Sequence, residues 1–100
     1  MASTLIWSRR AENDLFAIID WIDQSSSGYA NSVADRIERR AENLCDQPRQ
    51  GRRLPENDTP REIREVFVYR WRLIYEVADG QITLLAVHPS AMPIENAPPL

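Results

Sequence analysis

Few residues of this 100-residue sequence could carry out chemistry, and two of them stand out. His88 is the only histidine and could act as a general base, although a packing role is favoured because no partner residue is evident. Arg72 lies within an apolar segment, where a guanidinium either pairs with Glu65 or Glu76 or binds an anionic ligand. The sequence has no glycine-rich phosphate loop, no paired metal-ligand spacing and no serine–histidine–acid set. We therefore expect no metal and no cofactor, and we assign no catalytic residue.

The basic residues have an uneven distribution. All twelve are arginines, and seven of them fall between residues 47 and 75, against four acidic residues. Arg49, Arg52 and Arg53 could contact phosphate or the acidic groups of a target. An equally weighted alternative is that they neutralise the acidic helices of the same chain. The net charge of −3 argues against nonspecific binding to nucleic acid, and we expect no direct recognition of a nucleic-acid sequence.

Short strands position Arg72 and His88. Residues 64–88 are typical of three strands joined by two tight turns, and Asp79-Gly80 is the stronger hairpin signal. Counting outward from this turn predicts two faces. The core face would hold Trp71, Leu73, Tyr75, Val77, Ile82, Leu84, Ala86 and His88. The outer face would hold Arg72, Ile74, Glu76, Thr83, Leu85 and Val87, a mixture of charged and aliphatic side chains that favours docking of a partner. Arg64 falls on the core face, where its guanidinium needs a carboxylate or carbonyl groups.

The rest of the chain predicts an α+β fold. Residues 4–7 form a short strand, residues 9–24 an amphipathic helix that Ser8 caps, and a second helix follows Gly28 and ends near Asp46. Residues 47–61 form a loop, and the first strand of the meander follows at 63–68. The predicted order is β-α-α-β-β-β: an N-terminal strand, a helical hairpin and a three-stranded antiparallel meander that completes a small curved sheet.

Length and composition predict one domain over residues 1–100, with an irregular tail from about Pro89. The single cysteine, Cys45, excludes an internal disulfide. No apolar run approaches the length of a membrane span, so we expect a cytoplasmic protein that has no membrane partner.

The order of these elements and four groups of residues resemble the ParE/RelE superfamily of toxins from type II toxin–antitoxin modules. The four groups are Ala11 with Asp14-Leu15 and Ile18, Pro48 with Gly51, Arg64-Glu65 before Trp71–Tyr75, and Val87-His88 with Ala91-Met92. The resemblance covers nearly the whole chain, and the closing HPSAM segment is similar to the ParE-like branch.

The resemblance implies two alternative activities. RelE-like members cleave mRNA on the ribosome with basic residues on the outer face of the sheet, and Arg72 matches one of them. Glu65 reverses the charge at another such position, and Met92 occupies the position of a C-terminal arginine. If the protein were such a ribonuclease, Arg72 and His88 would be its candidate catalytic residues. ParE-like members bind DNA gyrase instead, and an antitoxin whose C-terminal segment wraps the toxin neutralises them.

From the resemblance we predict a toxin of the plasmid-stabilisation type that binds a protein target, DNA gyrase, and that a ParD-like antitoxin neutralises in a hetero-oligomer. The expected partner-binding residues are Glu65, Arg72, Ile74, Glu76, Leu85 and Val87. The alternatives are a RelE-like ribosome-dependent endoribonuclease and a relative that retains antitoxin binding alone.

Overall fold

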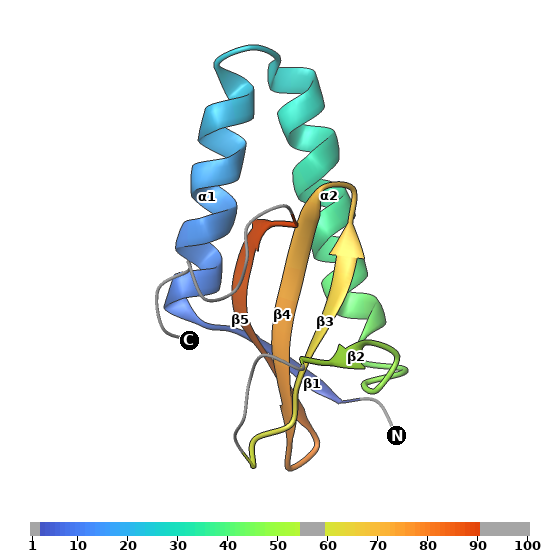
Figure 1. The fold of residues 1–100 in the computed structure, drawn as a ribbon. Helices are drawn as coiled ribbons and strands as arrows, with labels where there is room; N and C mark the ends of the chain where they lie inside the picture. The colour runs from blue at the N-terminus through green and yellow to red at the C-terminus, as the bar shows by residue number, and fades with distance from the viewer. Residues whose placement is uncertain (1–2, 55–59, 91–100) are drawn as a thin grey trace.

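The computed structural model describes residues 3–54 and 60–90, which form two helices and a five-stranded sheet (Figure 1). The elements in chain order are β1 (Thr4–Trp7), α1 (Arg9–Asp23), α2 (Ser27–Asn43), β2 (Arg52–Arg53), β3 (Ile63–Val68), β4 (Trp71–Ala78) and β5 (Gln81–Pro89). This arrangement confirms the predicted α+β class. Residues 55–59 of the predicted loop and the tail beyond Ser90, including Ala91 and Met92, lie outside the described residues.

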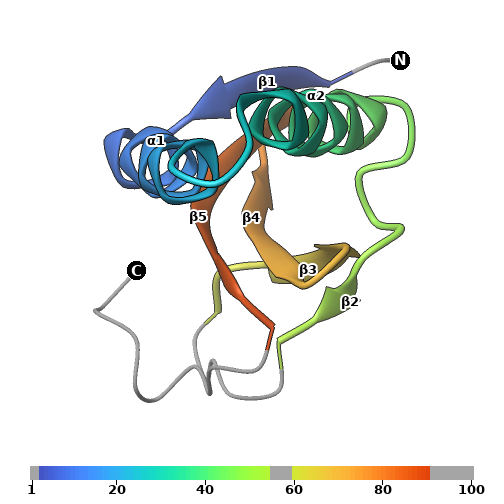
Figure 2. The same ribbon diagram turned by 90° about the horizontal axis from the view of Figure 1, so that it is seen from above.

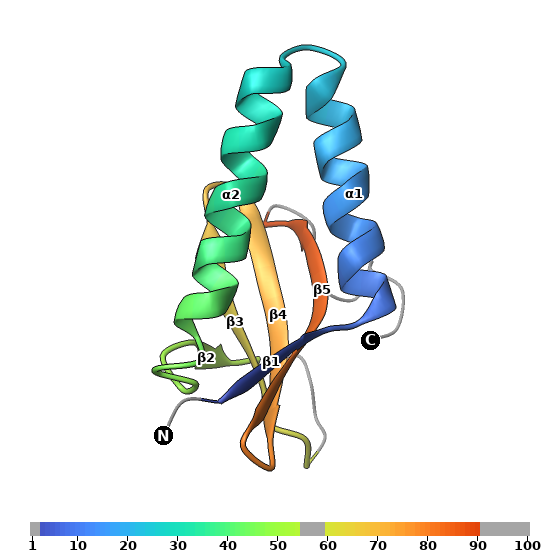
Figure 3. The same ribbon diagram turned by 180° about the vertical axis from the view of Figure 1, so that it is seen from behind.

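The sheet places the first strand beside the last. Its strand order is β1-β5-β4-β3-β2, in which β1 runs parallel to β5 and the other neighbours are antiparallel. The helical hairpin packs on one face of this sheet and extends beyond the β3–β4 turn (Figures 1 and 3). Figure 2 shows that the sheet curves from β1 to β2.

The first helix begins where the sequence predicts, whereas the second begins at Ser27 and includes Gly28, which was predicted to precede it; each helix buries one apolar stripe. The Ser8 hydroxyl accepts a hydrogen bond from the Ala11 backbone N–H at 3.0 Å, and Ser26 caps α2 in the same way. A capping hydroxyl satisfies one of the N–H groups that have no partner in the first helical turn. The buried helical residues then pack against β4 and β5 in the main core, whose members include Leu15, Val33, Ile37, Leu73, Tyr75 and Leu84.

Two tight turns connect β3, β4 and β5. Asp79 and Gly80 both have positive φ, 53° and 71°, as the Asp-Gly signal predicts for a two-residue hairpin. Tyr69 also has a positive φ of 54°, although its side chain favours other conformations. Val68 nevertheless pairs with Trp71 across this turn, which sets the register of β3 against β4.

A β-bulge at Leu85 makes part of the predicted face assignment wrong. Ile74 pairs with Ala86 and Tyr75 pairs with Leu84, so Leu85 is an extra residue in β5. One extra residue moves every later side chain of the strand to the opposite face. His88 therefore shares the outer face with its cross-strand partner Arg72, as Ala86 does with Ile74, while Val87 packs in the main core. The assignments between Trp71 and Leu84 are correct.

Contacts from the first helix hold the bulged segment of β5. Ser8 donates its backbone N–H to the Leu84 carbonyl at 2.9 Å and its hydroxyl to the Leu85 carbonyl at 3.2 Å. One Asp14 carboxylate oxygen accepts a hydrogen bond from the Val87 N–H at 2.9 Å. These groups replace a neighbouring strand where β1 no longer covers the edge of β5.

Two boundaries differ from the prediction. The second helix ends at Asn43 rather than near Asp46. Within the predicted loop, Arg52 and Arg53 form β2 and pair with Glu65 and Arg64. No helix in the described part of the chain combines the length and apolar character that crossing a membrane requires.

Candidate functional site

The outer face of the sheet centres on a buried ion pair. Glu65 on β3 contacts Arg72 on β4 through Arg72 Nε, at 2.7 Å, and through one terminal nitrogen of the same guanidinium. The second Glu65 oxygen accepts a hydrogen bond from Arg52 Nε on β2 at 2.5 Å. Glu65 is 1% exposed and Arg72 is 5% exposed. One carboxylate thus compensates two guanidinium groups in a largely dry environment.

The expectation that this face is open to solvent is wrong. Ile74 is buried as well as Glu65 and Arg72, and Val87, which was predicted on this face, lies in the main core. Ile74 packs with Leu54, Ile63 and Ala86 in a second, smaller apolar cluster on the outer side, and Leu85 is half-buried against it. The alternation of residues within β4 and β5 could not predict that Leu54, which follows β2, packs onto this face. Of the six predicted partner-binding residues, only Glu76 and Leu85 retain partly exposed side chains.

The structure brings together the two residues that a ribonuclease would need. Arg72 and His88 are cross-strand partners on β4 and β5. His88 is 6% exposed, and neither ring nitrogen has a hydrogen-bond partner among residues 3–54 and 60–90. Burial lowers the pKa of His88 from its ordinary value, and the positive charges of Arg72 and Arg10 lower it further, against the opposing effect of Asp14 and Glu65. His88 is therefore a buried, neutral base.

The side chains of Arg49, Arg52 and Arg53 form hydrogen bonds with groups of the same chain. Arg49 forms a two-pronged ion pair with Glu62, at 2.8 and 3.0 Å. Arg52 binds Glu65, and Arg53 donates to the Arg61 carbonyl at 3.2 Å. None of these partners lies in a helix, so the contacts do not bear out the alternative that the arginines neutralise the acidic helices. Contact of these arginines with a target stays a prediction.

Arg64 and Tyr75 anchor the segment that carries these arginines. As expected from its face, Arg64 meets a carboxylate and a carbonyl: it donates to Glu62 at 2.8 Å and to the Gly51 carbonyl at 2.6 Å. The Tyr75 hydroxyl donates to the Pro48 carbonyl at 2.8 Å and accepts from the Gly51 N–H at 3.0 Å. A side chain at Gly51 would collide with the Glu65 carbonyl and with the Tyr75 hydroxyl.

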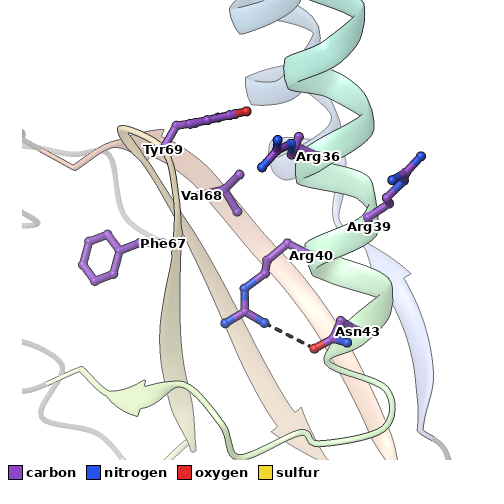
Figure 4. A pocket seen from close by; sticks show the side chains of 7 residues that line it. All are labelled: Arg36, Arg39, Arg40, Asn43, Phe67, Val68 and Tyr69. Atoms are coloured by element: carbon purple, nitrogen blue, oxygen red, sulfur yellow. Dashed lines mark hydrogen bonds between the residues drawn. The ribbon is translucent and has the colours of Figure 1, made fainter.

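Two surface features were not identified from the sequence. The first is a groove of about 400 Å³ between α2 and the end of β3 (Figure 4). Its lining residues are Arg36, Arg39, Arg40, Asn43, Phe67, Val68 and Tyr69. The second is Trp21 on α1, which is 66% exposed and lines an apolar groove with Ile18 and Trp71. The sequence signal for the first groove is the pair Arg36 and Arg40, which are one helical turn apart in the second helix.

No group of three or more histidine, cysteine, aspartate or glutamate side chains within residues 3–54 and 60–90 could hold a metal ion.

Comparison with known proteins defines the class to which this fold belongs. Residues 5–93 match the family model described as the ParE toxin of the type II toxin–antitoxin system parDE. The chain therefore belongs to the ParE toxin family, within the superfamily that the sequence resembles.

Two similar proteins support this assignment. The chain is 34% identical over 87 residues to Toxin RelE2 of Caulobacter vibrioides, an alignment that covers 87% of this chain and 94% of that protein. Its fold is similar to a solved structure of the chromosomal ParDE toxin–antitoxin system from P. aeruginosa, with a TM-score of 0.72 and 22% identity over 88% of this chain and 96% of that chain.

Proposed function

We propose that this toxin acts by binding a protein target, DNA gyrase, and that a ParD-like antitoxin neutralises it in the cytoplasm. The family assignment supports a toxin of a type II module. The observation that carries the proposal of binding, as opposed to catalysis, is the buried pair of Arg72 and Glu65. A cation that stabilises a phosphodiester transition state must reach the phosphate, and its charge must be available there.

The residues of the outer face meet neither condition. The charge of Arg72 is compensated by Glu65 within hydrogen-bond distance, and 5% of the residue is accessible. His88 is equally buried, so that a ribose hydroxyl could not reach its ring nitrogens without rearrangement of the sheet face. A binding toxin needs no such rearrangement, because its exposed side chains alone make the contacts.

A RelE-like ribonuclease is the second candidate, and one observation favours it. The bulge at Leu85 makes Arg72 and His88 direct neighbours on one face. A cation beside a neutral base is a combination suited to cleavage of a phosphodiester. This activity would require the ribosome or the substrate to expose both side chains.

On the outer face of the sheet, the antitoxin can contact only side chains that remain accessible. Glu76 and Leu85 are partly exposed, and Glu76 forms an ion pair with Arg61 at 3.0 Å. The similar fold from P. aeruginosa was solved as a ParDE system. We expect the antitoxin to be encoded by the neighbouring reading frame and to form a hetero-oligomer with this chain.

Two assays of the purified protein test the proposal. In a supercoiling assay with DNA gyrase, the protein should inhibit the enzyme or trap it on cleaved DNA, and added antitoxin should restore activity. In a translating extract, transcripts should remain intact. Cleavage of transcripts with no effect on gyrase would replace the proposal with the ribonuclease alternative. Controlled expression in cells should likewise induce the DNA-damage response before any loss of mRNA.

A further inference from the structure

An exposed aromatic surface lies near the tip of the helical hairpin, where the hairpin extends beyond the β3–β4 turn (Figure 1). Trp21 on α1 is 66% exposed and Tyr29 on α2 is 51% exposed. Trp21 borders two grooves of about 390 and 380 Å³, and Arg70 and Trp71 line both of them. Exposed aromatic patches with a polar rim mark interaction sites, and Trp, Tyr and Arg are the residues that most often dominate the binding energy of an interface.

Contacts with the sheet and the core hold the walls of these grooves in place. Trp71 pairs with Pro89 across β4 and β5, and the Ser90 N–H donates to the Arg70 carbonyl at 2.7 Å. Trp71 belongs to the main core, and Ile18 of α1 packs against the same core. Because these walls are already ordered, association at this surface loses less conformational entropy than association at a mobile loop.

Two opposite charges flank the surface without meeting each other. Arg70 is exposed in the β3–β4 turn, which forms the wall opposite α1. Asp20 is exposed on α1 and immediately precedes Trp21. It is one helical turn from Ala17 and from Gln24, each of which lines one of the grooves. Within the described part of the chain neither Arg70 nor Asp20 forms an ion pair. The surface therefore has an anion on one side of Trp21 and a cation on the other.

We propose that this surface binds a second copy of the chain in a two-fold symmetric dimer. In such an interface the same patch is used by both copies, and every contact between unlike residues occurs twice. A two-fold axis beside Trp21 exchanges the two sides of the patch, so that Asp20 of each copy faces Arg70 of the other. The two indole rings are then buried against the apolar walls of the grooves.

The distribution of charge favours a second copy as the occupant. A patch that binds itself must either be neutral or carry both signs of charge on opposite sides, and Asp20 and Arg70 meet this requirement. The groove between α2 and β3 does not meet it, because Arg36, Arg39 and Arg40 all line that groove. Two copies in contact there would bring like charges together. The inference goes beyond the proposed function and does not depend on the target of the toxin.

Sedimentation velocity of the full-length toxin over a dilution series tests the inference, and it should show a monomer–dimer equilibrium. Trp21→Ser should weaken the dimer by at least about thirtyfold, because a buried tryptophan at the centre of an interface is a dominant contact. Phe16→Ser is the matched control. Phe16 is also an aromatic residue of α1, 63% exposed, but it lines a different groove with Glu38, so its replacement should leave the association unchanged.

Reversal of the two charges tests the symmetry. Asp20→Arg and Arg70→Asp should each weaken the dimer by about tenfold, because each substitution replaces two accessible ion pairs with two pairs of like charge. An equimolar mixture of the two single variants should form a heterodimer with the affinity of the unmodified protein, since both pairs are then between opposite charges. A contact within one chain could not give this rescue. Thermal unfolding of each variant shows whether it is folded.

A toxin that stays monomeric over the whole dilution series would overturn the inference, as would equal dimerisation of the Trp21→Ser and Phe16→Ser variants. Mixed charge-reversal variants that associate no better than each does alone would refute the two-fold arrangement. A monomeric toxin in which Trp21→Ser abolishes binding of the antitoxin or inhibition of gyrase would assign the surface to that protein instead.

Discussion

Glu65 on β3 and Arg72 on β4 meet diagonally across the two strands as a buried ion pair, and Arg52 completes the cluster from β2. The cluster of three residues joins three neighbouring strands on the outer face of the sheet. It also determines what Arg72 can do, since a guanidinium held by a buried carboxylate contributes to structure and is poorly placed to receive a substrate.

Substitution of Glu65 by Gln should destabilise the protein severely. The change removes the negative charge that compensates Arg72 and Arg52, and loss of one partner from a buried pair costs about 3–5 kcal/mol. Urea denaturation measures the free energy of unfolding. The control is Asp35→Asn, which breaks the exposed pair with Arg39 and should cost less than about 1 kcal/mol. An equal loss of unfolding free energy in the two variants would show that the Glu65–Arg72 pair contributes no more to stability than an exposed ion pair.

Substitution of Gly51 by Ala should destabilise the protein by about 1–3 kcal/mol, because the added methyl group has no space. It would lie 2.6 Å from the Tyr75 hydroxyl and closer still to the Glu65 carbonyl. Gly28→Ala is the matched control, since nothing lies within 4 Å of a methyl group there. Because Gly28 lies in α2, its replacement should be neutral or stabilising by up to about 1 kcal/mol. Thermal unfolding of both variants measures the difference.

Stability should fall as the pH is lowered through the ordinary pKa of histidine. Burial lowers the pKa of His88 in the folded state, so at mildly acidic pH the unfolded chain binds more protons than the folded chain. The free energy of unfolding therefore decreases from roughly pH 7.5 to roughly pH 5.5, above the range in which carboxylates titrate.

His88→Leu tests this assignment, because it removes the titrating group and keeps an apolar side chain at a buried position. The free energy of unfolding of this variant should vary less over the same pH interval. A pH dependence identical to that of the unmodified protein would assign the effect to other groups.

Substitution of Asp14 by Ala should loosen the edge of β5 next to the bulge. The change removes the acceptor of the Val87 N–H, and loss of a hydrogen bond to a charged group costs about 1.5–3 kcal/mol. Amide hydrogen exchange should show faster exchange at Val87, with little change at the centre of β4. Asp20→Ala on the exposed side of the same helix is the control and should leave the Val87 amide protected.

The local elements could be predicted because their signals are short in range. The alternation of Trp71, Leu73 and Tyr75 reports the strand period, and Asp79-Gly80 supplies the positive φ angles of its turn. Ser8 caps α1 through the backbone three residues away. The anchoring role of Arg64 also followed from its position, because a half-buried guanidinium on the core face must find acceptors.

The faces beyond Leu84 could not be predicted in this way. Alternation assumes an uninterrupted strand, and nothing in the sequence around Leu85 signals an extra residue. The bulge is held by Ser8 and Asp14, which are 77 and 73 positions from their partners Leu85 and Val87. A count along one strand contains no information about those contacts.

The sequence by itself determined the α+β class, the order of the elements and the superfamily, since periodicity, capping and turn chemistry act within a few residues. Only the tertiary structure decided that Val87 enters the core and that His88 lies beside Arg72. It also decided that Glu65 compensates the charge of Arg72, on which a catalytic role would depend. The physical reason is that burial and charge compensation depend on which distant segments meet. On the helical side, the same packing brings Arg36 and Arg40 into one groove with the end of β3.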